Sequence, residues 1–238
     1  MFSRSARIYD AVYSWKDYPR EAERVHELVQ ARKPGAETLL DVACGTGAHL
    51  AGLRRWYRCE GLDLDGELLA VARERLPDVP LHRGDMRDFD LGRSFDAVTC
   101  LFSSIGYVLT VEALEAAVAS MARHLEPGGV LVVEPWLAPE AVVVPHVGAV
   151  FVDEPELKIA RVNTIEVDGR RSSFEFQYLV GTPAGVEHFT ERHELGLFTR
   201  EEHLAAFRAA GLAVEHDEEG LMGRGLYLGV APPRPPRS

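Results

Sequence analysis

Residues 39–50 read LLDVACGTGAHL, a short apolar run that includes Asp41 and is followed by two glycines, Gly45 and Gly47. An apolar run, a glycine turn and a helical pattern in this order are typical of an open parallel α/β sheet. Glycine is needed where a ligand lies directly on the backbone, because no Cβ then stands between them. The stretch therefore predicts a nucleotide-like ligand at the end of a first strand.

The loop differs from a dinucleotide-binding loop at its third glycine position. That glycine lets a pyrophosphate reach the helix N-terminus, and here the position holds Leu50. Asp41 lies at the strand end, where a carboxylate repels a pyrophosphate and attracts a cation. The loop therefore favours a ligand with an ammonium group, such as an amino acid.

Two further acids end the next two predicted strands. Asp63 occupies the place from which a carboxylate accepts both hydroxyls of a ribose. Asp85 can accept the exocyclic amine of an adenine, with Met86 beside the ring. Strand-end aspartates also serve as helix caps, and NAD sites share the Gly-x-Gly and the ribose acid, so both alternatives stay open.

Strand-like and helix-like segments alternate along residues 20–136, which predicts a parallel α/β sheet. The expected strands cover 37–43, 59–65, 79–85, 94–102 and 130–136, and the expected helices cover 20–33, 48–56, 66–76 and 111–125. Residues 148–197 change to an alternating β pattern with turns at 168–169 and 182–185, which predicts three or four antiparallel strands added to the parallel sheet. A helix follows from Thr199, with Glu202 completing a capping box, and then two last strands.

Composition narrows the class of protein. The chain has 238 residues and a net charge of −11, which suits a single domain over 1–238 and disfavours nucleic acid as a partner. Its three scattered cysteines indicate neither a disulfide framework nor a metal site. It has no run apolar enough for a signal peptide or a membrane span, so a cytoplasmic location is expected, with a disordered proline-rich tail at 231–238.

Several motifs together resemble the class I S-adenosylmethionine-dependent methyltransferases. They are DVACGTG (41–47), GLDLD (61–65), GDMRDF (84–89), FSSIGY (102–107) and LEPGGVLVVEPW (125–136). The resemblance covers nearly the whole chain and is greatest to the amino-sugar N-methyltransferases of antibiotic biosynthesis, of the desosamine and mycaminose type. It implies a Rossmann-like domain with a mostly parallel seven-stranded sheet, helices on both faces and an inserted antiparallel sheet. It also implies S-adenosyl-L-methionine as methyl donor, S-adenosyl-L-homocysteine as product, and a homodimer through the inserted sheet.

The resemblance also implies which residues hold the methyl donor. Its amino-acid end would meet Tyr9, Asp41, Ala43, Gly45 and Gly47; its ribose would meet Asp63; its adenine would meet Leu64, Asp85 and Met86; and its methionine chain would lie over Leu101 and Phe102.

Methyl transfer to an amine asks little of the protein beyond positioning and removal of a proton. Tyr107, beyond the fourth strand, and His193, on the insertion, are candidate bases. Arg224 is a candidate clamp for the diphosphate of a nucleotide-linked sugar, because a planar guanidinium binds phosphate oxygens well. Tyr18, Ser103 and Trp136 are expected to wall the substrate.

Two departures from the sugar enzymes affect the acceptor. The stretch between Tyr9 and Lys16 is shorter, and Leu137 replaces a second tryptophan after Glu-Pro-Trp. N- or O-methylation of another small metabolite therefore stays open. So does a non-catalytic protein that binds S-adenosylmethionine.

Overall fold

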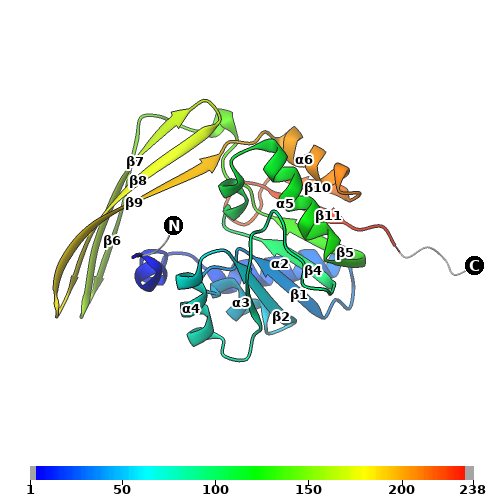
Figure 1. Cartoon of the computed structure of the whole chain (residues 1–238), viewed down its shortest axis with the longest axis horizontal. Coiled ribbons are helices and arrows are strands. Elements are labelled where there is room, and N and C mark those ends of the chain that lie inside the picture. Colours follow the sequence, from blue (N-terminus) through cyan, green and yellow to red (C-terminus); the bar gives the residue numbers. More distant parts are fainter. Residues whose placement is uncertain (1–3, 234–238) are drawn as a thin grey trace, which may run out of the picture.

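Seven strands form one sheet in the order β10-β11-β5-β4-β1-β2-β3 in the computed structural model, which describes residues 4–233 (Figure 1). The strands from β5 to β3 run parallel, and β10 and β11 run antiparallel to their neighbours. They are β1 (Thr38–Val42), β2 (Arg58–Asp63), β3 (Leu81–Arg83), β4 (Phe95–Cys100), β5 (Leu125–Val133), β10 (Ala213–Asp217) and β11 (Leu226–Val230). The order reverses between β1 and β4, and such a reversal opens a crevice at the carboxyl ends of the strands.

Helices cover both faces of this sheet (Figure 1). One face carries α2 (Tyr18–Arg32), α3 (Ala48–Leu53) and α4 (Gly66–Arg75), and the other carries α5 (Val111–Arg123) and α6 (Arg200–Ala209). Successive residues of a strand point to opposite faces, so Leu39 packs under the first set and Leu40 under the second. Both are fully buried, which contributes about 1.5–3 kcal/mol each. The sequence prediction of this sheet is confirmed.

Local capping sets where the helices begin. Thr199 and Glu202 form the predicted capping box of α6. The α2 helix begins two residues earlier than the apolar pattern indicates, because Asp17 accepts a hydrogen bond from the Arg20 amide (3.1 Å) and Pro19 fits its first turn. At the end of α5 the Glu-Pro-Gly-Gly stretch already belongs to β5, with an irregular register beside β4.

The insertion forms a separate antiparallel sheet of β6 (His146–Glu154), β7 (Leu157–Asp168), β8 (Arg171–Thr182) and β9 (Gly185–Gly196). The inserted antiparallel sheet that the resemblance implies is confirmed. The expectation that its strands are added to the parallel sheet is wrong, because β11 already pairs with the free edge of β5. The second sheet stands beyond the carboxyl ends of the parallel strands (Figure 1). Between the two sheets lie the short helices η1 (Ala6–Ile8) and α1 (Tyr9–Val12), while η2 (Ser104–Val108) and η3 (Pro139–Ala141) follow β4 and β5.

The C-terminal segment is ordered at its start. The Ala231 amide donates to Gly129 O (2.9 Å) and the Gly128 amide donates to Pro232 O (3.2 Å), so the predicted disordered tail does not begin at residue 231. Residues 234–238 of that prediction lie outside the described part of the chain. Among the helices of residues 4–233, none combines the length and apolar character needed to cross a bilayer.

Candidate active site

A cavity of about 890 Å³ lies between the carboxyl ends of the parallel strands and the inner face of the second sheet. A much smaller cavity of about 30 Å³ lies beside it, under the glycine loop. Of the residues expected at the methyl donor, the large cavity is lined by Tyr9, Ala43, Gly45, Asp63, Leu64, Asp85, Met86 and Phe102, and the small one also by Asp41 and Leu101. The structure therefore brings together residues from four strand ends and the N-terminal segment.

The backbone at two of these strand ends is strained. Ala43 after β1, and Phe102 and Ser103 after β4, have φ angles of 59°, 52° and 62°, in the left-handed region that non-glycine residues rarely adopt. Such residues cluster at functional sites and persist only where the surrounding structure holds them. All three line the large cavity.

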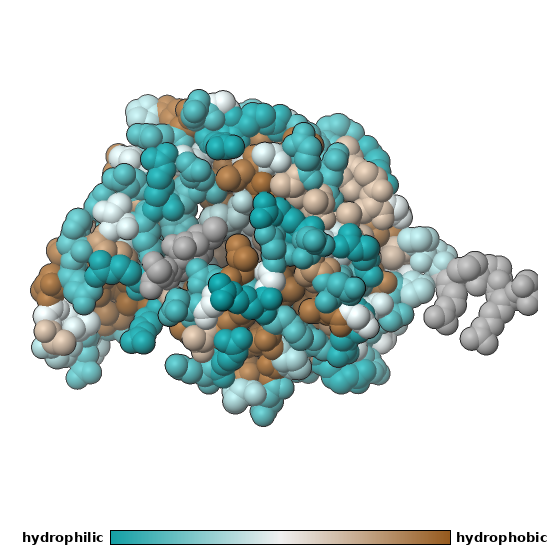
Figure 2. Space-filling model, viewed as in Figure 1, coloured by the Kyte–Doolittle hydropathy of each residue, from teal (hydrophilic) through white to brown (hydrophobic). Residues whose placement is uncertain are grey.

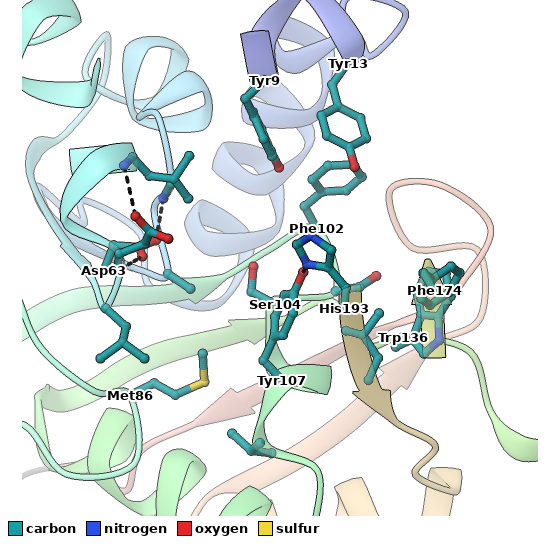
Figure 3. Close-up of a pocket in the computed structure, with 18 of the residues that line it drawn as sticks. Tyr9, Tyr13, Asp63, Met86, Phe102, Ser104, Tyr107, Trp136, Phe174 and His193 are labelled. Carbon is teal, nitrogen blue, oxygen red and sulfur yellow. Dashed lines mark hydrogen bonds between the residues drawn. The ribbon is translucent and has the colours of Figure 1, made fainter. Parts of the chain in front are cut away.

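Asp63 is fixed by hydrogen bonds from two backbone amides. Its Oδ2 accepts a hydrogen bond from the Gly45 amide and its Oδ1 one from the Asp65 amide, both at 2.8 Å (Figure 3). Burial raises the pKa of Asp63. Each carboxylate oxygen has a second lone pair, so the held carboxylate can also accept the two hydroxyls of a ribose.

The next strand end suits an adenine ring. Leu64 leaves 52% of its surface exposed at the cavity, which gives a flat base an apolar face to cover. Asp85 is paired with Arg87, whose Nε donates to Oδ1 at 2.9 Å, and these hydrogen bonds lower the pKa of Asp85. The paired carboxylate keeps lone pairs for an exocyclic amine, and Met86 lines the cavity beside it.

The small cavity has the groups that an amino-acid zwitterion needs. Asp41 is buried there and accepts a hydrogen bond from Thr99 Oγ1 (2.7 Å), and burial raises its pKa to about 6. A nearby ammonium group would favour the charged carboxylate. The Tyr18 hydroxyl is also buried, with no hydrogen-bond partner among the described residues, and can donate to a carboxylate. The donor set therefore fits the methionine end of S-adenosylmethionine.

Two predicted residues have surroundings other than those expected. Tyr18 was expected at the substrate, but the start of α2 places it at the small cavity beside His49 of α3, with ring centroids 4.9 Å apart. Gly47 lines neither cavity. A Cβ there would come within 2.9 Å of the Leu76 side chain, so this glycine allows the loop to pack closely against α4 and its end.

A buried charged network under the small cavity was missed by the sequence analysis. Lys16 contacts both carboxylate oxygens of Glu21, and His49 Nε2 lies 2.8 Å from Glu21 Oε2. Burial opposes the charge of Glu21, but hydrogen bonds from His49 and Lys16 lower its pKa. The Lys16 ammonium also lies 4.4 Å from the centre of the Phe102 ring, so the network supports the strained end of β4. The positions of Lys16, Glu21 and His49 in the sequence do not indicate that their side chains meet.

Tyr107 and His193, predicted separately, meet in the large cavity. The Tyr107 hydroxyl lies 2.9 Å from His193 Nδ1, and Figure 3 shows the two side chains pointing toward each other from η2 and β9. Burial raises the pKa of Tyr107 well above its ordinary value, so the phenol keeps its proton. His124, in contrast, lies outside the cavity, where Nε2 accepts from the Leu91 amide (3.0 Å) and Nδ1 lies 2.8 Å from Ser120 O.

The large cavity is also lined by Arg224, Ser103 and Trp136. The Arg224 guanidinium lies 4.7 Å above the centre of the Trp136 ring and donates to Ser103 Oγ (2.8 Å). Trp136 is itself fixed, because its Nε1 donates to Ser172 Oγ (3.0 Å) on β8. No carboxylate lies within ion-pair distance of Arg224 in the part of the chain that the structure describes. Its charge is therefore available to an anion.

Comparison with known proteins gives consistent matches. The model of a methyltransferase domain family matches residues 39–129. The chain is 49% identical to dTDP-3-amino-3,4,6-trideoxy-alpha-D-glucopyranose N,N-dimethyltransferase of Streptomyces venezuelae, over 94% of this chain and 97% of the relative. Its fold is similar to the crystal structure of Streptomyces venezuelae DesVI (TM-score 0.91, 49% identity, 95% and 98% of the two chains). It is also similar to CalS10 with S-adenosylmethionine bound, an amino pentose methyltransferase from Micromonospora echinaspora (TM-score 0.86, 46% identity, 94% and 96%).

Proposed function

Because the chain belongs to the family of S-adenosylmethionine-dependent sugar N-methyltransferases, we propose that it methylates the amino group of a nucleotide-linked deoxyamino sugar. CalS10 is described as taking part in calicheamicin biosynthesis. We further propose that the protein helps to make the sugar of an antibiotic and that it acts in the cytoplasm. The observation that carries it is Arg224, which forms no ion pair with any carboxylate of residues 4–233 and lies in the same cavity as the Tyr107–His193 pair.

The methyl donor would be held by the strand-end residues that line the two cavities. Asp63 would bind the ribose, Leu64 and Asp85 the adenine, and Asp41 and Tyr18 the amino-acid end. When bound, S-adenosylmethionine supplies a methyl group on a positively charged sulfur. The Tyr13 and Phe102 rings, with centroids 5.1 Å apart, would give this part of the cavity an apolar wall, which favours a reaction that disperses charge.

The acceptor would lie in the part of the large cavity lined by Arg224, Trp136, Tyr107 and His193, which we call the acceptor half. A diphosphate carries negative charge, and a planar guanidinium can bind two of its oxygens at once. Arg224 stays charged, although burial lowers its pKa. Its packing on Trp136 fixes the plane of the fork. We infer that Arg224 binds the diphosphate and so places the sugar between Trp136 and Tyr107.

The amino group must be neutral and correctly oriented to accept a methyl group. If Tyr107 donates its proton to His193 Nδ1, its phenolic oxygen is left as an acceptor for an N–H of the sugar amine. This hydrogen bond would hold the amine and direct its lone pair toward the methyl donor. The contribution of Tyr107 is therefore orientation and proton removal.

Direct assay of methyl transfer tests the proposed function. The protein is incubated with S-adenosylmethionine and, in parallel, a dTDP-linked 3-amino-3,6-dideoxy sugar, the same amino sugar without nucleotide, and a simple phenol. Mass spectrometry should show mono- and dimethylated product from the nucleotide-linked amine and little from the others. Preferential methylation of the phenol or of the free sugar would contradict the proposal.

Replacement of Arg224 by alanine should raise KM for the dTDP-linked sugar about tenfold or more, because a hydrogen-bonded charge contributes about 1.5–3 kcal/mol. Steady-state kinetics measures this effect. Calorimetry should give an unchanged Kd for S-adenosyl-L-homocysteine, since Arg224 lies in the acceptor half. Arg200→Ala is the matched control, because Arg200 is a surface arginine paired with Glu218 (3.0 Å) outside the cavity. An unchanged KM in Arg224→Ala would indicate an acceptor without a diphosphate.

The outer face of the second sheet supports a homodimer. Phe151, Ala160 and Leu179 lie side by side across β6, β7 and β8, and Phe151 is 73% exposed. Val147 and Val162 extend this apolar face, and brown patches mark apolar residues on the four-stranded sheet in Figure 2. Exposed apolar patches of this kind mark interaction surfaces. We propose that a second copy of the chain covers this face.

Phe151→Glu should convert the dimer to a monomer, because a charge in the centre of an apolar interface costs several kcal/mol. Light scattering after size exclusion measures the mass. Val143→Glu is the matched control, since Val143 is 70% exposed but precedes β6, outside the sheet. A parent protein that is already monomeric at assay concentration would contradict the dimer.

A further inference from the structure

Glu191 lies behind the Tyr107–His193 pair, two residues before His193 on β9. Alternate residues of a strand point to the same face, so Glu191 and His193 share the inner face of the second sheet. Glu191 Oε2 lies 3.7 Å from His193 Nε2, and Tyr107 lies on the other side of the ring, at Nδ1. We propose that Glu191 completes a proton relay that runs from the acceptor amine through Tyr107 and His193. The proposal rests on the proposed function of the cavity.

The chemical environment sets the direction of the relay. The Tyr107 phenol holds its proton, so it is the natural donor to His193 Nδ1. A neutral imidazole has one ring hydrogen, which then lies on Nε2 and faces the Glu191 carboxylate. The separation of 3.7 Å is longer than a direct hydrogen bond but within ion-pair distance. This is the arrangement in which a carboxylate orients an imidazole for proton transfer.

Glu191 is held in place and kept charged. It accepts hydrogen bonds from Ser5 Oγ (2.5 Å), the Ser5 amide (3.1 Å) and the Arg4 amide (3.2 Å). Burial opposes the charge, but the nearby His193 ring and the hydrogen bonds from Ser5 lower the pKa of Glu191. On the β8 side the His193 ring meets the uncharged Phe176 ring, with centroids 5.2 Å apart. Glu191 therefore supplies the negative charge on the β9 side of this imidazole.

The relay accounts for the surplus proton of the reaction. In methylation of a neutral amine, the nitrogen would form a new N–C bond while the methyl–sulfur bond of the donor breaks and its electron pair stays on sulfur as a neutral thioether. The product is an ammonium nitrogen, which has no lone pair for a second methylation. Its proton can pass to the Tyr107 oxygen while the phenolic proton of Tyr107 passes to His193 Nδ1. Tyr107 is neutral again, and His193 becomes an imidazolium ion beside Glu191. Because an unpaired buried cation is costly, Glu191 is the positioning residue that makes this state accessible.

Glu191→Gln tests the relay, because it removes the charge and keeps the shape. It should lower kcat about tenfold, leave both KM values unchanged, and shift the product from dimethylated toward monomethylated sugar. Glu191→Asp should recover part of kcat. Glu187→Gln is the matched control. Glu187 lies on the same strand and pairs with Arg4 (2.8 Å), but does not touch His193, so this variant should match the parent.

A second measurement separates the relay from the choice of acceptor. Nitrogen NMR of histidine-labelled protein follows protonation of the His193 ring without any substrate. The ring should need a lower pH to become protonated in Glu191→Gln than in the parent or in Glu187→Gln. Equal titration in all three proteins, or parent-like kcat and dimethylation in Glu191→Gln, would overturn the relay. A parent that methylates no amino sugar would instead overturn the proposed function, and the titration would still decide the pairing.

Discussion

Replacement of Asp63 by alanine is expected to weaken S-adenosylmethionine binding about a hundredfold. A hydrogen bond to a charged acceptor contributes about 1.5–3 kcal/mol, and the ribose would lose two of them. The variant also leaves the Gly45 and Asp65 amides without their carboxylate acceptor, so the glycine loop would lose its fixed position. Titration calorimetry with S-adenosyl-L-homocysteine measures the loss of affinity directly.

Two variants define what this loss means. Asp63→Asn keeps one acceptor oxygen and should have an intermediate affinity. Asp88→Ala removes an exposed acid of the loop after β3 that does not line the cavity, so it should bind like the parent. Binding of Asp63→Ala within a factor of three of the parent would show that the ribose is held elsewhere.

The part of the cavity that we propose for the methyl donor could be predicted as a cluster of residues, because it follows from strand ends. Asp41, Asp63 and Asp85 each lie at or just after a parallel strand, and parallel strands bring their carboxyl ends to one edge. No contact between distant segments had to be known. The pattern could not show that Gly47 serves packing against α4, because a glycine that admits a ligand and one that admits a helix look alike in a sequence.

The part of the cavity that we propose for the acceptor could be predicted only as separate residues. Tyr107 and His193 are 86 positions apart, and their contact depends on a second sheet that stands apart from the first. The alternating pattern predicted antiparallel strands but not their place, since the free edge of β5 was taken by β11. Glu191 had one signal in the sequence, its position two residues before His193, which puts both side chains on one face of a strand.

The left-handed backbone at Ala43, Phe102 and Ser103 could not be foreseen from residue types, because none is glycine, asparagine or aspartate. These conformations depend on the packing around them. The network of Lys16, Glu21 and His49 supplies part of that packing under Phe102. The left-handed conformation after β4 therefore depends on the buried network packed under Phe102. The sequence around Phe102 does not predict it without that network.

Tyr107→Phe is expected to lower kcat about a hundredfold, with little change in either KM. The ring remains, so the cavity keeps its shape, but the hydroxyl that would hold the amine and take its proton is lost, and such groups contribute about 10²–10⁴-fold. Rapid-quench measurement of a single turnover isolates the methyl-transfer step.

Substitution of His193, the hydrogen-bond partner of Tyr107, should lower kcat in the same way. His193→Ala should reduce kcat to a similar extent, and the double variant should lose hardly more than either single one, because residues that act in one chain are not additive. Tyr57→Phe is the matched control, since the Tyr57 hydroxyl also lies 2.9 Å from a histidine, His26 Nδ1, but Tyr57 lines neither cavity. Full additivity of the two losses would mean that Tyr107 and His193 act separately. Parent-like turnover in Tyr107→Phe would mean that positioning alone, without this hydroxyl, supplies the rate.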